Sequence, residues 1–213
     1  ATSAVLNVND SPTGSVTIIG TATEGQTLTA INNLADGDGL GSISYQWKRA
    51  GEAISGATAS TYSLVQADVG SVITVTASYS DGQGNAESIS SAATSAVLNV
   101  NDSPTGSVTI TGTVTEGQTL TAINNLADDD GLGSVSYQCK RAGSPITDAT
   151  SSTYSLVQAD VGSVITVTAS YTDGQGTAES VTSAATSTVV DAPESTPEPE
   201  NSVKRFYNSS DGR

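Results

Sequence analysis

Hydrophobic and polar residues alternate along most of the chain, in short runs separated by turns rich in glycine and aspartate. In the longest run, 72–79, Ile73, Val75, Ala77 and Tyr79 fall on one side and mostly serine and threonine on the other. A period of two predicts a β-strand with one buried face. Further strands are predicted near Ile54 and at 14–23, 27–31, 43–47, 60–65 and 86–100. No segment has a helical period, so the chain is predicted to be all-β.

The whole pattern recurs at an offset of 92 residues, because Ala1 to Pro12 return unchanged as Ala93 to Pro104. The match continues without a gap to about Thr186, with roughly eight positions in ten identical. Repeated units of this size indicate two tandem domains of about ninety residues each. Near-identical copies favour a role in length and spacing over chemistry, since each unit of an array contacts only its neighbours.

Charge narrows the range of partners. The 213 residues carry 22 acidic and 7 basic side chains, a net charge of −15. Nucleic acids and anionic membranes both require basic surface, so we expect neither as a partner, and no apolar run is long enough to insert into a membrane. With one cysteine, no disulfide can form within the chain. The chain starts inside a repeat, and we expect it to be an excerpt of a longer protein.

The single cysteine, Cys139, stands where the first repeat has Trp47. We expect both residues to fill the same core position, so the second repeat should be less well packed, at a cost of about 3 kcal/mol unless neighbouring side chains close in. A reactive thiol would need an exposed, electropositive site, and the surrounding sequence indicates none.

Two segments carry a family resemblance. Residues 45–51, Tyr-Gln-Trp-Lys-Arg-Ala-Gly, resemble the third strand of an immunoglobulin-like domain with its core tryptophan, and Ala67-Asp68-Val69-Gly70 resembles that family's corner before the sixth strand. The unit is similar to the Ig-like and cadherin-like repeats of large bacterial surface adhesins and type I-secreted, RTX-adhesin-like proteins. The resemblance implies two tandem Ig-like, seven-stranded antiparallel β-sandwiches in an extended arrangement.

This organisation predicts five segments. Residues 1–11 end a preceding repeat, 12–102 and 103–190 form the two Ig-like repeats, 191–202 form a linker rich in proline and glutamate, and 203–213 begin a further domain.

Calcium is the implied cofactor. The linker Asn99 to Pro104 resembles the Asp-x-Asn-Asp-Asn linker of cadherins, and Asp128-x-Asp130 resembles the loop that completes the cadherin calcium site. Asn99 and Ser103 depart from that pattern, which predicts weaker binding or fewer ions. Oxygen donors of this kind suit Ca²⁺. The candidate ligands are Glu24, Asp68, Asn99, Asn101, Asp102, Asp128, Asp130 and Asp173. The alternative is that these acids only form turns, because aspartate caps its own backbone.

Catalysis finds little support, because the chain has no histidine and its acids recur in predicted turns. We expect a non-catalytic spacer of a secreted or surface-bound bacterial adhesin, monomeric, with neighbouring repeats of the same chain as its partners. One alternative is a module that binds a surface glycan or a protein, with Tyr45, Tyr62 and Tyr79 as aromatic platforms. Another is an accessory region of a secreted enzyme.

Overall fold

The computed structural model describes residues 6–193. By the density of internal contacts these residues form a first unit, residues 6–106, 126–135 and 170–180, and a second unit, residues 107–125, 136–169 and 181–193. The predicted further domain at 203–213, most of the 191–202 linker and part of the N-terminal segment lie outside the described residues. The domain boundaries at 12–102 and 103–190 therefore stay a prediction.

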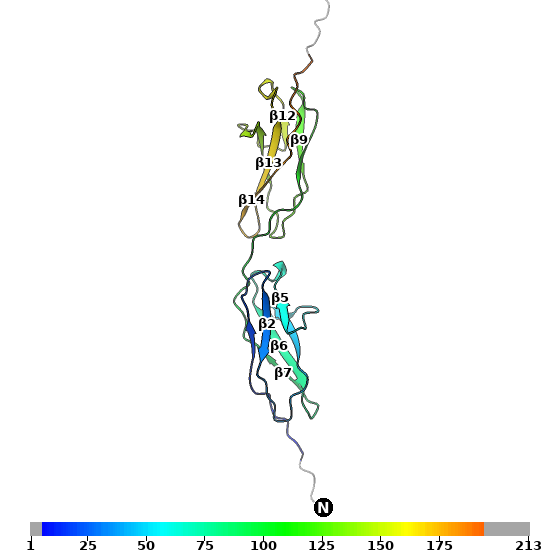
Figure 1. The fold of residues 1–213 in the computed structure, drawn as a ribbon, viewed down its shortest axis with the longest axis vertical. Coiled ribbons are helices and arrows are strands. Elements are labelled where there is room, and N and C mark those ends of the chain that lie inside the picture. The colour runs from blue at the N-terminus through cyan, green and yellow to red at the C-terminus, as the bar shows by residue number, and fades with distance from the viewer. Residues whose placement is uncertain (1–5, 194–213) are drawn as a thin grey trace, which may run out of the picture. The chain divides into compact units, whose positions relative to one another are not determined.

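The strands of the first repeat form two antiparallel sheets (Figure 1, blue to green). One has the order β1-β2-β5, with β1 at Val16–Ile19, β2 at Thr27–Asn32 and β5 at Thr61–Ser63. The other has the order β4-β3-β6-β7, with β4 at Glu52–Ala53, β3 at Ser44–Arg49, β6 at Ile73–Ser80 and β7 at Ala86–Ser90. This distribution of strands is that of an immunoglobulin-like sandwich, which confirms the predicted fold class.

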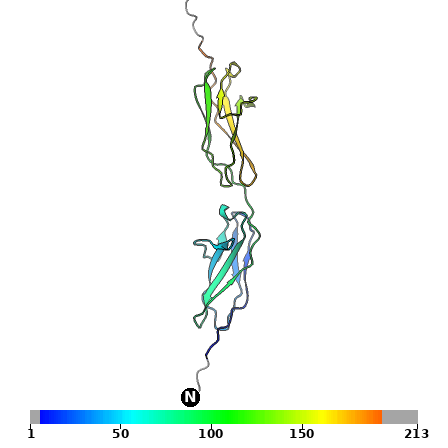
Figure 2. The same cartoon turned by 180° about the vertical axis from the view of Figure 1, so that it is seen from behind.

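The second repeat has the same strand order (Figure 2, green to yellow). Its first sheet contains β8 (Val108–Thr111), β9 (Thr119–Asn124) and β12 (Thr153–Ser155). Its second sheet contains β10 (Ser136–Arg141), β11 (Ser144–Pro145), β13 (Ile165–Thr172) and β14 (Ala178–Thr182). Within residues 6–193 the helices are two short 3₁₀ turns, η1 (Gln66–Asp68) and η2 (Gln158–Asp160), and neither is long and apolar enough to cross a membrane.

Alternation along β6 builds the core of the first repeat. Ile73, Val75, Ala77 and Tyr79 are all buried, as the period of two predicts, and the residues between them are half-buried. They belong to the same hydrophobic cluster as Leu28, which comes from the opposite sheet. The two sheets are thus joined through apolar side chains that each strand presents at every second position.

Trp47 and Cys139 occupy corresponding core positions. Trp47 is fully buried, its Nε1 donates a hydrogen bond to the Ala59 carbonyl oxygen at 2.9 Å, and its ring stacks on Tyr62 with the centroids 5.8 Å apart. Cys139 is also buried, and its N–H donates to the Ala149 carbonyl oxygen at 2.9 Å. The prediction of a shared core position is confirmed.

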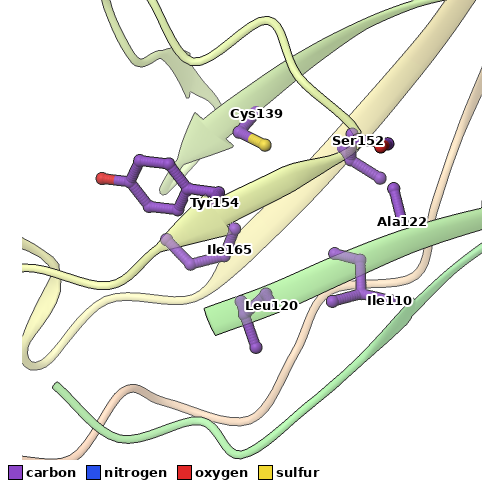
Figure 3. Close-up of a pocket in the computed structure, with 8 residues that line it drawn as sticks. Ile110, Leu120, Ala122, Cys139, Ser152, Tyr154 and Ile165 are labelled. Atoms are coloured by element: carbon purple, nitrogen blue, oxygen red, sulfur yellow. The ribbon is translucent and has the colours of Figure 1, made fainter. Parts of the chain in front are cut away.

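A small cavity remains beside the Cys139 thiol (Figure 3). It offers about 10 Å³ to the centre of a water molecule, which is close to the room that one water molecule needs. Burial, and then the charge of Asp160, raises the pKa of the Cys139 thiol, which therefore stays protonated and structural. The lining side chains are Ile110, Leu120, Ala122, Ser152, Tyr154, Ile165 and Val167.

The strand predicted at 86–100 is shorter than expected, because β7 ends at Ser90. Beyond it, the hydroxyl groups of Ser91 and Thr94 accept hydrogen bonds from the N–H groups of Val75 and Ile73 on β6, at 3.1 and 3.0 Å. Side-chain oxygens thus replace some of the backbone acceptors that a continuous strand would offer to β6, and the regular strand ends there. The chain then forms isolated parallel bridges, one of them between Val97 and Val69.

The corner before β6 is built around Asp68, which is fully buried. Its Oδ1 lies 2.7 Å from the Nε of Arg49, and its Oδ2 accepts hydrogen bonds from the N–H of Val65 at 2.9 Å and the hydroxyl of Tyr62 at 3.0 Å. The hydrogen bond to Asp68 raises the pKa of Arg49. In the second repeat Asp160 pairs with Arg141 at 2.6 Å.

Candidate functional site

Three carboxylates converge in the first unit, from Glu24, Asp102 and Asp130. One carboxylate oxygen from each lies within 4.8 Å of the others. Glu24 sits in the turn between β1 and β2, where its N–H donates to the Leu98 carbonyl oxygen at 2.9 Å. Its Oε2 accepts a 3.3 Å hydrogen bond from the N–H of Val100, so the turn and the segment leading to Asp102 are already linked.

Asp130 is the buried member of this acidic cluster. Its Oδ2 accepts a hydrogen bond from the N–H of Asp102 at 2.8 Å, and its Oδ1 accepts one from the Nε2 of Gln66 at 2.9 Å. The N–H of Asp130 donates to Asp128 Oδ1 at 2.9 Å, which is the local turn that aspartate favours. Backbone and amide donors therefore orient the carboxylate without neutralising it.

Within the described part of the chain, the acidic cluster forms no ion pair with a basic side chain. Burial, and then the negative charges of Asp130, Asp129 and Asp128, raises the pKa of Asp102. The two ion pairs recorded in residues 6–193 both lie elsewhere, at the Arg49 and Arg141 corners. The charges of the neighbouring loop thus make Asp102 harder to ionise, and a cation would reverse that effect.

Two amide oxygens have no hydrogen-bond donor, one on a residue close to Asp102 in the chain and one on a residue that is hydrogen-bonded to Asp130. The Oδ1 of Asn99 and the Oε1 of Gln66 are both inaccessible to solvent and unpartnered. Gln66 contacts Asp130 through its amide nitrogen, and Asn99 directly precedes Val100, whose N–H contacts Glu24. A buried acceptor without a donor normally indicates an unseen water or ion.

The predicted ligands divide into groups. Glu24, Asp102 and Asp130 are brought together. Asn101 instead donates through Nδ2 to Glu179 Oε1 at 2.8 Å, and Asp128 accepts a 2.5 Å hydrogen bond from the Tyr171 hydroxyl. The predicted acidic ligands not gathered in the cluster are Asp68, Asp128 and Asp173.

Asp68 does not join the cluster, because both of its oxygens serve Arg49, Tyr62 and Val65 in the corner. The sequence interpretation missed Gln66, which reaches Asp130 from the same corner. Gln66 is uncharged and lies in no recognisable motif, so the sequence gives no indication that it contacts Asp130.

A second group of acids lies in the first repeat, where carboxylate oxygens of Asp36, Asp38 and Asp81 lie within 4.8 Å of one another. Asp38 accepts hydrogen bonds from Asn7 Nδ2 at 2.6 Å and from the N–H of Asp10 at 2.7 Å. Protein donors already satisfy much of this group, so it matches the alternative reading of turn-forming aspartates.

The tyrosines considered as binding platforms are engaged within the first repeat. Tyr62 stacks on Trp47, Tyr79 is buried and donates to Asp36 Oδ2 at 2.6 Å, and Tyr45 accepts a hydrogen bond from Asn32 Nδ2 at 2.6 Å. Burial, followed by the hydrogen bond to Asp36, raises the pKa of Tyr79 to about 12. These contacts do not favour a carbohydrate platform made of the three rings.

No family model and no curated protein matches the sequence. Among solved structures, the chain is 20% identical to a tetra-tandem repeat in the extending region of a large adhesion protein, covering 83% of this chain and 50% of that one, with a TM-score of 0.33. The three N-terminal domains of the Hoc outer capsid protein of bacteriophage RB49 match at 16% identity, 80% and 59% coverage, and a TM-score of 0.28. Tandem Ig repeats of Dlar match at 12% identity, 84% and 96% coverage, and a TM-score of 0.24.

The chain spans about half the length of the first of these structures and less than two thirds of the second. At such identities and TM-scores the likenesses carry no argument about function. The immunoglobulin-like assignment rests on the order and pairing of the strands themselves.

Proposed function

We propose that the chain is a non-catalytic spacer segment of a large secreted or cell-surface adhesin, and that calcium at the Glu24–Asp102–Asp130 cluster stiffens the connection between its repeats. The observation that carries the proposal is the convergence of three carboxylates from a turn, a linker and a loop, with no ion pair to a basic side chain among residues 6–193. The same fold recurs twice with nearly the same sequence, as a spacer requires.

The donor set fits a hard divalent cation. Ca²⁺ takes six to eight oxygen ligands and accepts carboxylates, amide oxygens and water in flexible geometries. Glu24, Asp102 and Asp130 would hold the ion, and the unpartnered oxygens of Asn99 and Gln66 are further candidates. The ion would supply positive charge among the three negatively charged carboxylates, which repel one another in its absence.

The proposed role is mechanical. Without the cation, mutual repulsion favours separation of the turn, the linker and the loop. With the cation bound, the three segments are tied to a single point, and movement of the linker is restrained. A spacer built in this way is stiff where calcium is abundant and pliable where it is scarce.

A charge-neutral substitution tests the site. Glu24→Gln is expected to weaken Ca²⁺ binding at least about tenfold, because loss of even an outer-shell partner commonly costs that much in metal affinity. The measurement is calorimetric titration of Ca²⁺ into the metal-stripped chain, with the melting temperature followed in parallel.

Glu116 provides the matched control, because it occupies the same turn of the second repeat. Its N–H donates to the Val190 carbonyl oxygen at 2.9 Å, as that of Glu24 does to Leu98, but the side-chain amide of Gln158 lies 3.1 Å from both of its carboxylate oxygens. Glu116→Gln should leave this binding event unchanged. The proposed site would be excluded if the two substitutions weakened Ca²⁺ binding equally, or if Glu24→Gln left Ca²⁺ binding unchanged.

A further inference from the structure

The first sheet of each repeat ends in a strand whose outer edge is unpaired within residues 6–193. β1 lies at the end of the order β1-β2-β5, and β8 lies at the end of the equivalent sheet. β1 and β2 are antiparallel, and the N–H of Asn33 donates to the Ser15 carbonyl oxygen at 3.2 Å. In such a pair every second residue bonds to the partner strand, so the N–H and C=O groups of Val16 and Ile18 face the free edge.

A groove runs beside each of these edges. In the first repeat it has a volume of about 180 Å³ and lies between residues 16–18 and 92–94. The second repeat has the same groove, about 210 Å³ in volume, between residues 108–110 and 184–186. Each sandwich therefore has an open side, between its first strand and the segment that follows its last strand.

The open side is uncharged, although the chain has a net charge of −15. Residues 13–23 and 88–98 contain no charged side chain, and the corresponding residues of the second repeat contain none either. The edges of the other sheet differ, because β4 carries Glu52 and β7 carries Glu87. Natural proteins commonly protect an exposed edge with charged residues or proline, and β1 and β8 have neither. A second chain can thus approach these edges without like-charge repulsion at the contact.

We propose that the free edges of β1 and β8 are association surfaces for a second copy of this chain, whose β1 or β8 pairs with them in antiparallel orientation. The edge is complementary to itself, because a two-fold axis at Thr17 places Val16 of one copy opposite Ile18 of the other. Both pairs then exchange N–H···O bonds, and their β-branched side chains close the groove. Thr17 faces its counterpart as a non-hydrogen-bonded pair, and Thr109 takes the same place on β8.

This association goes beyond the proposed function, since it requires no calcium, and it departs from the monomer expected from the sequence. The contact is small, and small contacts between proteins are weak and transient. The acidic side chains outside the contact repel one another and oppose the association. Salt screens exposed charges that are more than about 8 Å apart at physiological ionic strength, so the association should strengthen as salt is raised.

Sedimentation velocity of the full chain in chelator tests the proposal. The mean mass of the wild-type chain should rise with concentration, and more steeply at high salt. Thr17→Glu combined with Thr109→Glu should weaken the association about tenfold, because two like charges then face each other across the paired strands. Thr17→Lys combined with Thr109→Lys should have the same effect. A mixture of the glutamate and lysine variants should restore the association, because opposite charges then face each other.

Thr61→Glu combined with Thr153→Glu is the matched control, because it makes the same change of net charge. Both are exposed threonines on β5 and β12, the strands at the other end of the same sheets. The inference is overturned if the wild-type mass does not rise with concentration, if the control weakens the association equally, or if the mixture fails to restore it. None of these results bears on the calcium proposal, because the test contains no calcium and neither Thr17 nor Thr109 is a candidate ligand.

Discussion

Trp47→Cys is expected to lower the free energy of unfolding of the first repeat by about 3 kcal/mol, because a fully buried indole is lost from its core. The indole also stacks on Tyr62 and satisfies the Ala59 carbonyl, and both contacts disappear with it. The measurement is urea unfolding of the full chain followed by circular dichroism.

The wild-type chain already contains the internal comparison. Trp47 is the one tryptophan in the sequence, so its fluorescence reports on the first repeat, whereas circular dichroism reports on both. The second repeat lacks the indole and should unfold first, giving a dichroism change at a urea concentration where the fluorescence is still native. Coincident transitions would show that the cysteine has been fully compensated.

Cys139→Trp is the reciprocal variant. The other residues that line the cavity are identical to those at the corresponding positions around Trp47, including Leu28, Ala30, Tyr62 and Val75. The walls that accept an indole in one repeat are therefore present in the other, and the variant should raise the stability of the second repeat by a similar amount. A loss of stability would mean that the core of the second repeat has repacked around the smaller cysteine side chain and cannot accommodate an indole without strain.

Asp68→Ala is expected to destabilise the first repeat by about 3 kcal/mol, because a fully buried acceptor of three donors is lost while the partly exposed Arg49 can still be solvated. The substitution leaves Arg49, the Tyr62 hydroxyl and the Val65 N–H without their shared acceptor. Chemical denaturation measures the change.

Glu52→Ala provides the control for charge, because Glu52 is an exposed acid on β4, and it should change stability by less than about 0.5 kcal/mol. The loss caused by Asp68→Ala should be equal in calcium and in chelator, since the partner of Asp68 is a guanidinium. A loss of stability that is seen only in calcium would instead identify Asp68 as a metal ligand.

Much of the fold follows from local pattern. The alternation along 72–79 identifies the buried face of β6 residue by residue, and the Trp47/Cys139 correspondence locates the centre of the core. The end of β7 could not be predicted, because Ser91 and Thr94 interrupt the ladder through hydroxyl contacts that no periodicity encodes.

The candidate site was predictable only in part. A resemblance to calcium-binding linkers and loops indicated Glu24, Asp102 and Asp130, which the structure brings together. The same reasoning also selected Asp68, which pairs with Arg49. From the sequence alone, an aspartate at a corner that binds a metal cannot be distinguished from one that binds an arginine.

Small-angle scattering of the metal-stripped chain, recorded in calcium and in chelator, tests the central claim most directly. If the Glu24–Asp102–Asp130 cluster stiffens the connection between repeats, the wild-type distribution of interatomic distances should narrow in calcium. Glu24→Gln should give the chelator profile in both conditions, and Glu116→Gln should behave as wild type. Superimposable wild-type profiles, at calcium concentrations where titration shows the site to be filled, would contradict the account.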